Sequence, residues 1–137
     1  MNEGPKYSYL RKVLATGATV FGLSAIFLLV SPALFNELLG FTSSGEIEWS
    51  MRMIAITLLA LCGNMLSVSL KGTDESVLFS SRVMALSAAG LGLLTLLIPV
   101  SSLTWFDYAY AAIGWGFSFA YVLGLVRFGN NPQTPSR

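Results

Sequence analysis

The sequence predicts an all-α fold: an integral membrane bundle of four transmembrane helices that run up-down-up-down, with both termini in the cytoplasm. Composition is the first reason. Hydrophobic residues make up 54% of the 137 residues and charged residues 11%, whereas soluble domains carry about 25% charged residues. The second reason is that the apolar residues gather in four uncharged segments of at least 18 residues. Each is long enough to approach the roughly 30 Å hydrocarbon core of a bilayer.

These segments place the expected helices at about 13–31, 52–70, 82–103 and 107–127. All four belong to one membrane domain, residues 1–127, and the Pro- and Asn-rich segment 128–137 is expected to be a disordered C-terminal tail. Basic residues precede the first segment, as they do in a signal peptide. The length of the segment, and the lack of an A-x-A-like cleavage site after it, favour a retained helix.

The residues after the first helix allow two structures. Pro32 ends or kinks that helix, because proline lacks a backbone N–H. The sequence ALFNELLGF at 33–41 then forms either a short amphipathic helix at the membrane interface or the frayed end of the first helix. A TSSG loop at 42–45 leads on to the second helix.

The basic residues predict the orientation of the bundle, because Lys and Arg concentrate in cytoplasmic loops. The N-terminal segment, the 71–82 connection and the C-terminal segment hold seven of the eight Lys and Arg residues, and Arg52 is the eighth. Both termini are therefore expected inside. The short tails and this strong bias favour the bacterial inner (cytoplasmic) membrane.

The last segment, 108–126, carries a ridge of small residues. Ala112, Gly116, Ala120 and Gly124 recur at every fourth position and therefore share one helix face. Small residues at this spacing let the backbone of a second helix approach closely, which matters in lipid because the hydrophobic effect does not drive helices together there. We expect this ridge to be a helix-packing face.

A few polar side chains near the expected outer surface form the candidate site. Arg52 opens the second helix, Asp107 opens the fourth, and Glu37 lies after the first. If the second and fourth helices are neighbours, Arg52 and Asp107 can form a bidentate ion pair that Glu37 joins. The group is either a small polar or anionic pocket at the mouth of the bundle or a structural staple in the headgroup region.

Asn64 is the polar residue nearest the middle of the second helix, beside Cys62 and Gly63. An amide at this depth either hydrogen-bonds across to another helix or contacts a pigment or the headgroup of a substrate. Cys62 is the single cysteine, so no disulfide and no CxxC redox pair is expected. We expect it to fill apolar space.

The chain lacks the residues that most catalytic and cofactor sites need. It has no histidine, which removes Ser/His/Asp catalysis and the commonest ligand of zinc and copper. The four uncharged segments hold no carboxylate for proton coupling and no lysine for a Schiff base. No cofactor and no catalysis by this chain alone is expected. The net charge of +1 provides no basic stripe for nucleic acid.

Four features of the chain occur together: a proline that closes the first helix (SPALFNELLGF, 31–41), Trp49 and Arg52 before the second, an Ala- and Gly-rich third helix, and Asp107 at the head of the fourth. This arrangement, over residues 13–126, resembles the DoxX-like small four-helix membrane proteins of bacteria. The resemblance implies the four-helix fold and, from the name-giving members, an association with a membrane oxidoreductase. It assigns no catalytic residue.

Three functions are compatible with these observations. The first expectation is a non-catalytic accessory or structural subunit of a larger membrane complex, or a homo-oligomer, that packs through small-residue helix faces. The alternative is a small membrane protein that binds or transports a lipid, quinone or other hydrophobic molecule near Arg52, Glu37 and Asp107. The third is a subunit of a membrane oxidoreductase whose partner supplies the cofactors. Membrane lipids and other membrane subunits are the expected partners.

Overall fold

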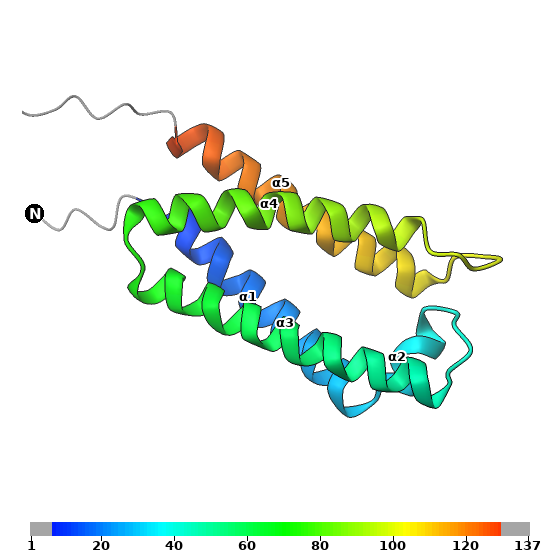
Figure 1. Ribbon diagram of the computed structural model, residues 1–137. Helices are drawn as coiled ribbons and strands as arrows, with labels where there is room; N and C mark the ends of the chain where they lie inside the picture. Colours follow the sequence, from blue (N-terminus) through cyan, green and yellow to red (C-terminus); the bar gives the residue numbers. More distant parts are fainter. Residues whose placement is uncertain (1–6, 130–137) are drawn as a thin grey trace, which may run out of the picture.

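The computed structural model describes residues 7–129, and within them every regular element is an α-helix (Figure 1). The helices are α1 (Ser8–Val30), α2 (Pro32–Leu38), α3 (Gly45–Lys71), α4 (Asp74–Leu96) and α5 (Trp105–Gly129). Four of these described helices, all except α2, are long and apolar enough to cross a membrane. The predicted all-α four-helix membrane bundle is therefore confirmed, and the chain is an integral membrane protein.

The four long helices are organised as two hairpins. α3 packs along α1, and α5 packs along α4, whereas the two hairpins touch each other over shorter stretches. Figure 1 shows the α1–α3 hairpin (blue and green) beside the α4–α5 hairpin (yellow-green and orange). α3 and α4 pack little against each other along their length, although only Gly72 and Thr73 join them. Two hairpins laid side by side are thus the building units of the fold.

The hairpins have two ends, which we name by their residues. The Arg11 end comprises the first turns of α1, the last turns of α3 and α5, and the start of α4. The α2 end comprises α2, the connections 39–44 and 97–104, and the start of α5 (Figure 1). Buried side chains form one cluster toward each end. The Arg11-end cluster includes Leu10, Leu14, Phe21, Met65, Met84 and Tyr121, and the α2-end cluster includes Leu28, Phe35, Leu39 and Ala55.

α3 and α4 begin before the predicted positions because their hydrogen-bonding caps lie outside the uncharged segments, whereas α1, which begins at Ser8 rather than 13, has no side-chain cap. The Ser44 side chain accepts a hydrogen bond from the Ile47 N–H, so α3 begins seven residues before the predicted position 52. Thr73 caps α4 in the same way, so this helix begins at Asp74, where a polar connection and a start at 82 were predicted. Ser and Thr are preferred caps because they satisfy amide groups that the helix leaves unpaired. α4 also ends at Leu96, before Pro99, rather than at 103.

The segment after the first helix is a separate short helix. α1 ends at Val30, and α2 begins at Pro32, which takes the first helical position where its missing N–H costs nothing. After α2 the chain reverses at Gly40, whose φ of +77° is a conformation that favours glycine. The short-helix alternative is thus what the structure shows. α2 packs against α1 and α3 and covers the α2-end cluster.

α4 and α5 approach each other closely through glycine. A Cβ atom added to Gly114 would lie 2.9 Å from the Ala88 carbonyl oxygen and 3.0 Å from the Gly92 nitrogen. Gly92 in turn faces the Trp115 ring and the Ala111 carbonyl oxygen. The two backbones therefore touch with no side chain between them, which is the packing that small residues permit between transmembrane helices.

The C-terminal end of α5 differs from the predicted tail at 128–137. Phe128 and Gly129 still belong to α5, and the remainder of the predicted tail, 130–137, lies outside the described residues. The first and last described residues lie at the same end of the molecule, as an even number of spans requires (Figure 1). The cytoplasmic location of that end stays a prediction from the basic residues.

Candidate functional site

At the Arg11 end, one arginine ties the two hairpins together. The Arg11 guanidinium donates to the backbone carbonyl oxygens of Ser69 (3.1 Å) and Gly72 (2.7 Å) and forms an ion pair with Asp74 at 3.1 Å. The Ser69 hydroxyl returns a hydrogen bond to the Arg11 carbonyl oxygen at 2.7 Å. α1, the end of α3 and the start of α4 are thereby held in one polar network, whose arginine is largely buried.

At the α2 end, a capping box starts α5 and ties it to α2. The Asp107 carboxylate accepts from the Thr104 N–H at 2.6 Å, and the Asp107 N–H donates to the Thr104 hydroxyl at 3.3 Å. This reciprocal pattern three residues apart satisfies two amide groups at a helix start. The Thr104 hydroxyl also lies 2.7 Å from the Leu38 carbonyl oxygen, to which it donates. Asp107 is fully buried here.

The polar group predicted at the outer mouth does not assemble. Arg52 and Glu37 are both exposed, while Asp107 is buried in its capping box. Within residues 7–129, neither Arg52 nor Glu37 forms an ion pair with it. The Arg52–Asp107 pair required the second and fourth spans to be neighbours, and it is absent from the described part of the chain because α3 and α5 do not pack against each other; the Thr104 N–H instead bonds to one carboxylate oxygen of Asp107.

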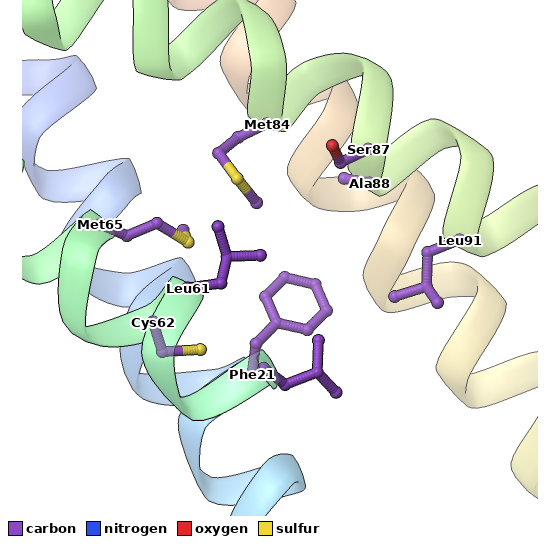
Figure 2. A pocket seen from close by; sticks show the side chains of 9 residues that line it. Phe21, Leu61, Cys62, Met65, Met84, Ser87, Ala88 and Leu91 are labelled. Atoms are coloured by element: carbon purple, nitrogen blue, oxygen red, sulfur yellow. The ribbon is translucent and has the colours of Figure 1, made fainter. Parts of the chain in front are cut away.

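Between the hairpins lies an apolar cavity of about 140 Å³ (Figure 2). Its walls come from α1, α3 and α4, and Figure 2 shows the Phe21 ring between the facing side chains of α3 and α4. The lining residues are Phe21, Leu58, Leu61, Cys62, Met65, Met84, Ser87, Ala88 and Leu91. Cys62 is thus a wall of apolar space, as its sequence context predicts. Its apolar lining suits apolar groups.

A second cavity, of about 290 Å³, lies beyond Phe21 between α1, α2 and α5. Aromatic rings form much of its wall, and edge-to-face contacts connect them: Phe35 meets Phe27, Phe106 and Tyr110 with ring centroids 5.6–6.0 Å apart. Such contacts hold each ring in a defined orientation. One polar pair lies within this wall, because the Ser24 and Tyr110 hydroxyls are hydrogen-bonded at 3.0 Å.

The aromatic cavity continues into an open groove along α1 and α5. Val20 and Ile113 line both the cavity and the groove, and Gly116, Phe117 and Ala120 complete the groove, whose volume is about 430 Å³. The Tyr9 hydroxyl donates to the Ala120 carbonyl oxygen at 3.3 Å, across the far end of the groove. Cavity and groove together form an elongated apolar channel that is open on its side.

The predicted small-residue ridge of α5 is mostly uncovered. Ala112 and Gly116 are exposed and Ala120 is half-buried, whereas Gly124 is buried against Leu10 and Tyr9 of α1. Nothing lies within 4 Å of a Cβ atom added to Gly116. The ridge faces the groove and the outside of the bundle, and the close contact with α4 uses the opposite face, through Gly114 and Ser118.

Asn64 also faces outward. Its side chain is exposed and makes no hydrogen bond within the described residues, and the neighbouring Gly63 has nothing within 4 Å of an added Cβ atom. Asn64 lines the rim of a shallow groove of about 230 Å³ between α3 and α4, opposite Ser80 and Val83. The predicted interhelical hydrogen bond is therefore not formed within residues 7–129.

Sequence reasoning missed several polar residues that the structure shows to be important. In the sequence, Arg11 is only one of the basic residues that predict the orientation, and its bonds to the α3–α4 connection are not predicted. Ser24 and Tyr110 lie within apolar segments, and their hydrogen bond is not predicted either. Pairing across 86 residues leaves no local signal. The capping box does leave one: Thr104-Trp105-Phe106-Asp107 has the T-x-x-D spacing of a helix start.

Comparison with known proteins adds no relative: no protein-family model, no curated protein and no solved structure matches this chain. The four membrane-spanning helices define the class: the chain is a small four-span integral membrane protein. The likeness to DoxX-like proteins rests on the sequence features alone, and of these the Pro32 helix break and the buried Asp107 have a structural role here.

Proposed function

We propose that this chain is a non-catalytic accessory subunit that packs against another transmembrane helix, supplied by a partner protein or by a second copy. The observation that carries the proposal is Asn64, an exposed amide with no hydrogen-bond partner within residues 7–129. It lies seven residues before the end of α3, about 10 Å along the helix. Where lipid rather than water surrounds a helix, an exposed amide is costly, so polar groups there normally find a partner.

The surface around Asn64 supports helix contact. Ala60 and Ser67 lie four and three residues from it on the same face, Gly63 is its neighbour in the chain, and all three are exposed, so α3 offers small side chains beside the amide. Small residues allow a second backbone to approach, and the amide can both donate to and accept from the approaching helix. The absence of histidine from the whole sequence supports the non-catalytic part of the proposal.

The test is assembly of the tagged full-length protein, extracted from its own membrane in mild detergent and sized on a native gel with mass spectrometry of the band. Wild type is expected in a band larger than one chain, and Asn64→Leu is expected to shift protein from this band to the single-chain band. An interhelical amide hydrogen bond contributes on the order of 1 kcal/mol, so its loss reduces the association constant about fivefold. Asn64→Gln, which keeps the amide, should retain the larger band.

Thr57→Val is the matched control, because Thr57 lies two turns earlier on the same face of α3 and is also exposed. Its hydroxyl already bonds to the Met53 and Ile54 carbonyl oxygens of its own helix, so its loss leaves no unpaired donor for a partner. A wild-type band of single-chain mass, or unchanged assembly of Asn64→Leu, would refute the proposal.

A further inference from the structure

The channel along α1 and α5 has the features of a lipid site, and this site is separate from the α3 face on which the proposed function rests. We propose that the aromatic cavity and its groove bind one acyl chain of a membrane glycerolipid, with the ester carbonyl oxygen of that chain at Ser24 and Tyr110. The ligand class follows from three properties of the channel: its hydrogen-bonding capacity, its length and its depth.

The hydrogen-bonding capacity comes from two hydroxyl groups that share one hydrogen bond. Ser24 and Tyr110 each carry one O–H, and the 3.0 Å bond between them uses only one of the two protons. The structure gives neither hydroxyl another partner within residues 7–129. One donor therefore remains, in a wall that is otherwise apolar, and in the hydrocarbon region a polar group needs a partner. A ligand that supplies an acceptor, such as a carbonyl oxygen, satisfies it.

The length of the channel matches one leaflet. From Tyr110 to Ala120 the groove follows ten residues of α5, about 15 Å at the rise of an α-helix. This is half of the roughly 30 Å hydrocarbon core and thus the span of the acyl chains in one leaflet. The floor suits an extended chain, because Gly116 and Ala120 leave room where larger side chains would fill the groove.

The depth of the hydroxyl pair places the carbonyl near the boundary of the hydrocarbon. Tyr110 lies about one turn after Asp107, the charged residue that directly precedes the uncharged segment 108–126. One turn is about 5 Å, so the pair lies just inside the apolar region, beneath the headgroups. An ester carbonyl placed there leads its acyl chain along the groove toward Ala120, while the headgroup stays with the polar residues of the α2 end.

The experiment measures lipid retention by the full-length protein in mild detergent, using native mass spectrometry. Two probes are compared: a phosphatidylglycerol with ester-linked palmitoyl chains and its analogue with ether-linked hexadecyl chains, which lacks the carbonyl oxygens. Wild type should retain the ester lipid about fivefold better than the ether lipid, the effect of one hydrogen bond. The double variant Ser24→Ala/Tyr110→Phe should retain both lipids equally, at the ether level.

Two further variants separate the site from unspecific lipid adhesion. Val20→Phe puts a larger side chain where cavity and groove meet and should reduce retention of both lipids at least fivefold. Thr19→Val removes a neighbouring exposed hydroxyl, which bonds to its own helix at Ala15, and should change nothing. The proposal is overturned if wild type does not distinguish ester from ether, or if the double variant keeps the preference. It is also overturned if a quinone that carries an alkyl chain displaces the ester lipid, because the cavity then binds a quinone ring in preference to an acyl chain.

Discussion

The interface between α4 and α5 (the hairpin seam) and the interface between the two hairpins (the seam between hairpins) are built in opposite ways. Inside the hairpin, glycine faces glycine, and a Cβ atom at Gly114 would lie 3.1 Å from the Gly92 Cα. Between the hairpins, large side chains such as Phe21 and Phe117 meet, and cavities of about 140 and 290 Å³ remain. Small residues in register close a seam completely, whereas bulky residues hold helices apart and leave space between their contacts.

The same comparison shows where the molecule is held. The hairpin seam is continuous along α4 and α5. The seam between hairpins is fixed by polar contacts at its two ends: Arg11 reaches the α3–α4 connection, and Thr104 reaches the end of α2. A lipid bilayer offers no hydrophobic force to close the middle of this seam. Its apolar space is therefore available to other apolar groups, including the surrounding lipid.

The largest expected effect comes from the glycine contact of the tight seam. Gly114→Ala should lower the free energy of unfolding by about 3 kcal/mol, because its Cβ meets the backbone of α4, which cannot yield as a flexible side chain would. Gly116→Ala, two residues away, adds the same atom to open space and should leave stability unchanged or slightly raised. Unfolding in detergent with increasing SDS measures both, and equal effects would contradict the comparison.

An intermediate effect is expected at the Arg11 end. Arg11→Ala removes the charge-assisted hydrogen bonds to the carbonyl oxygens of Ser69 and Gly72 and should cost about 2 kcal/mol. The Asp74 ion pair contributes little to this figure, because Asp74 is nearly half exposed. Lys12→Ala removes the same charge from an exposed neighbour and serves as the control in the same unfolding assay. If the two variants are equally stable, the Arg11 hydrogen bonds do not contribute to the free energy of unfolding.

The smallest effect is expected at the α2 end. Thr104→Val keeps the shape of the side chain but removes the donor to the Leu38 carbonyl oxygen and the acceptor for the Asp107 N–H, at a cost of about 1 kcal/mol. Hydrogen exchange of the first turn of α5 should rise with it. Thr19→Val, whose hydroxyl bonds only within its own helix, should show no change in that turn. A protected first turn in Thr104→Val would show that the cap is dispensable.

The sequence predicts the four spans well, because their signal is local: each is a run of apolar residues ended by charge or proline. It predicts their ends less well, since helices continue past the apolar run to caps such as Ser44 and Thr73. Hydropathy does not detect the polar residues that cap a helix, so it does not predict where the helix begins. The break at Pro32 is visible in the sequence because proline acts through its own backbone.

The candidate site is less accessible to sequence reasoning, because the relevant choices are made between distant helices. The ridge at every fourth residue of α5 predicts a packing face, but within the described residues only Gly124 of this ridge is covered, because α5 also has small residues on the opposite face. The structure packs Gly114 against α4 and leaves Gly116 open. Likewise, Arg52 and Asp107 share an expected depth, yet rotation of their helices exposes one and buries the other. Helix rotation has no local signature in a uniformly apolar segment.

The two-residue connection between α3 and α4 has a consequence for how the chain is made. Gly72 and Thr73 lie between the two hairpins in the sequence, so α1 and α3 both precede this connection and α4 and α5 both follow it. The ribosome therefore completes α1 and α3 as a pair before the first residue of α4 is synthesised. α1 can therefore pack with α3 as soon as both are made, whereas its contacts with α5, such as the Ser24–Tyr110 hydrogen bond, form only when the last helix is complete.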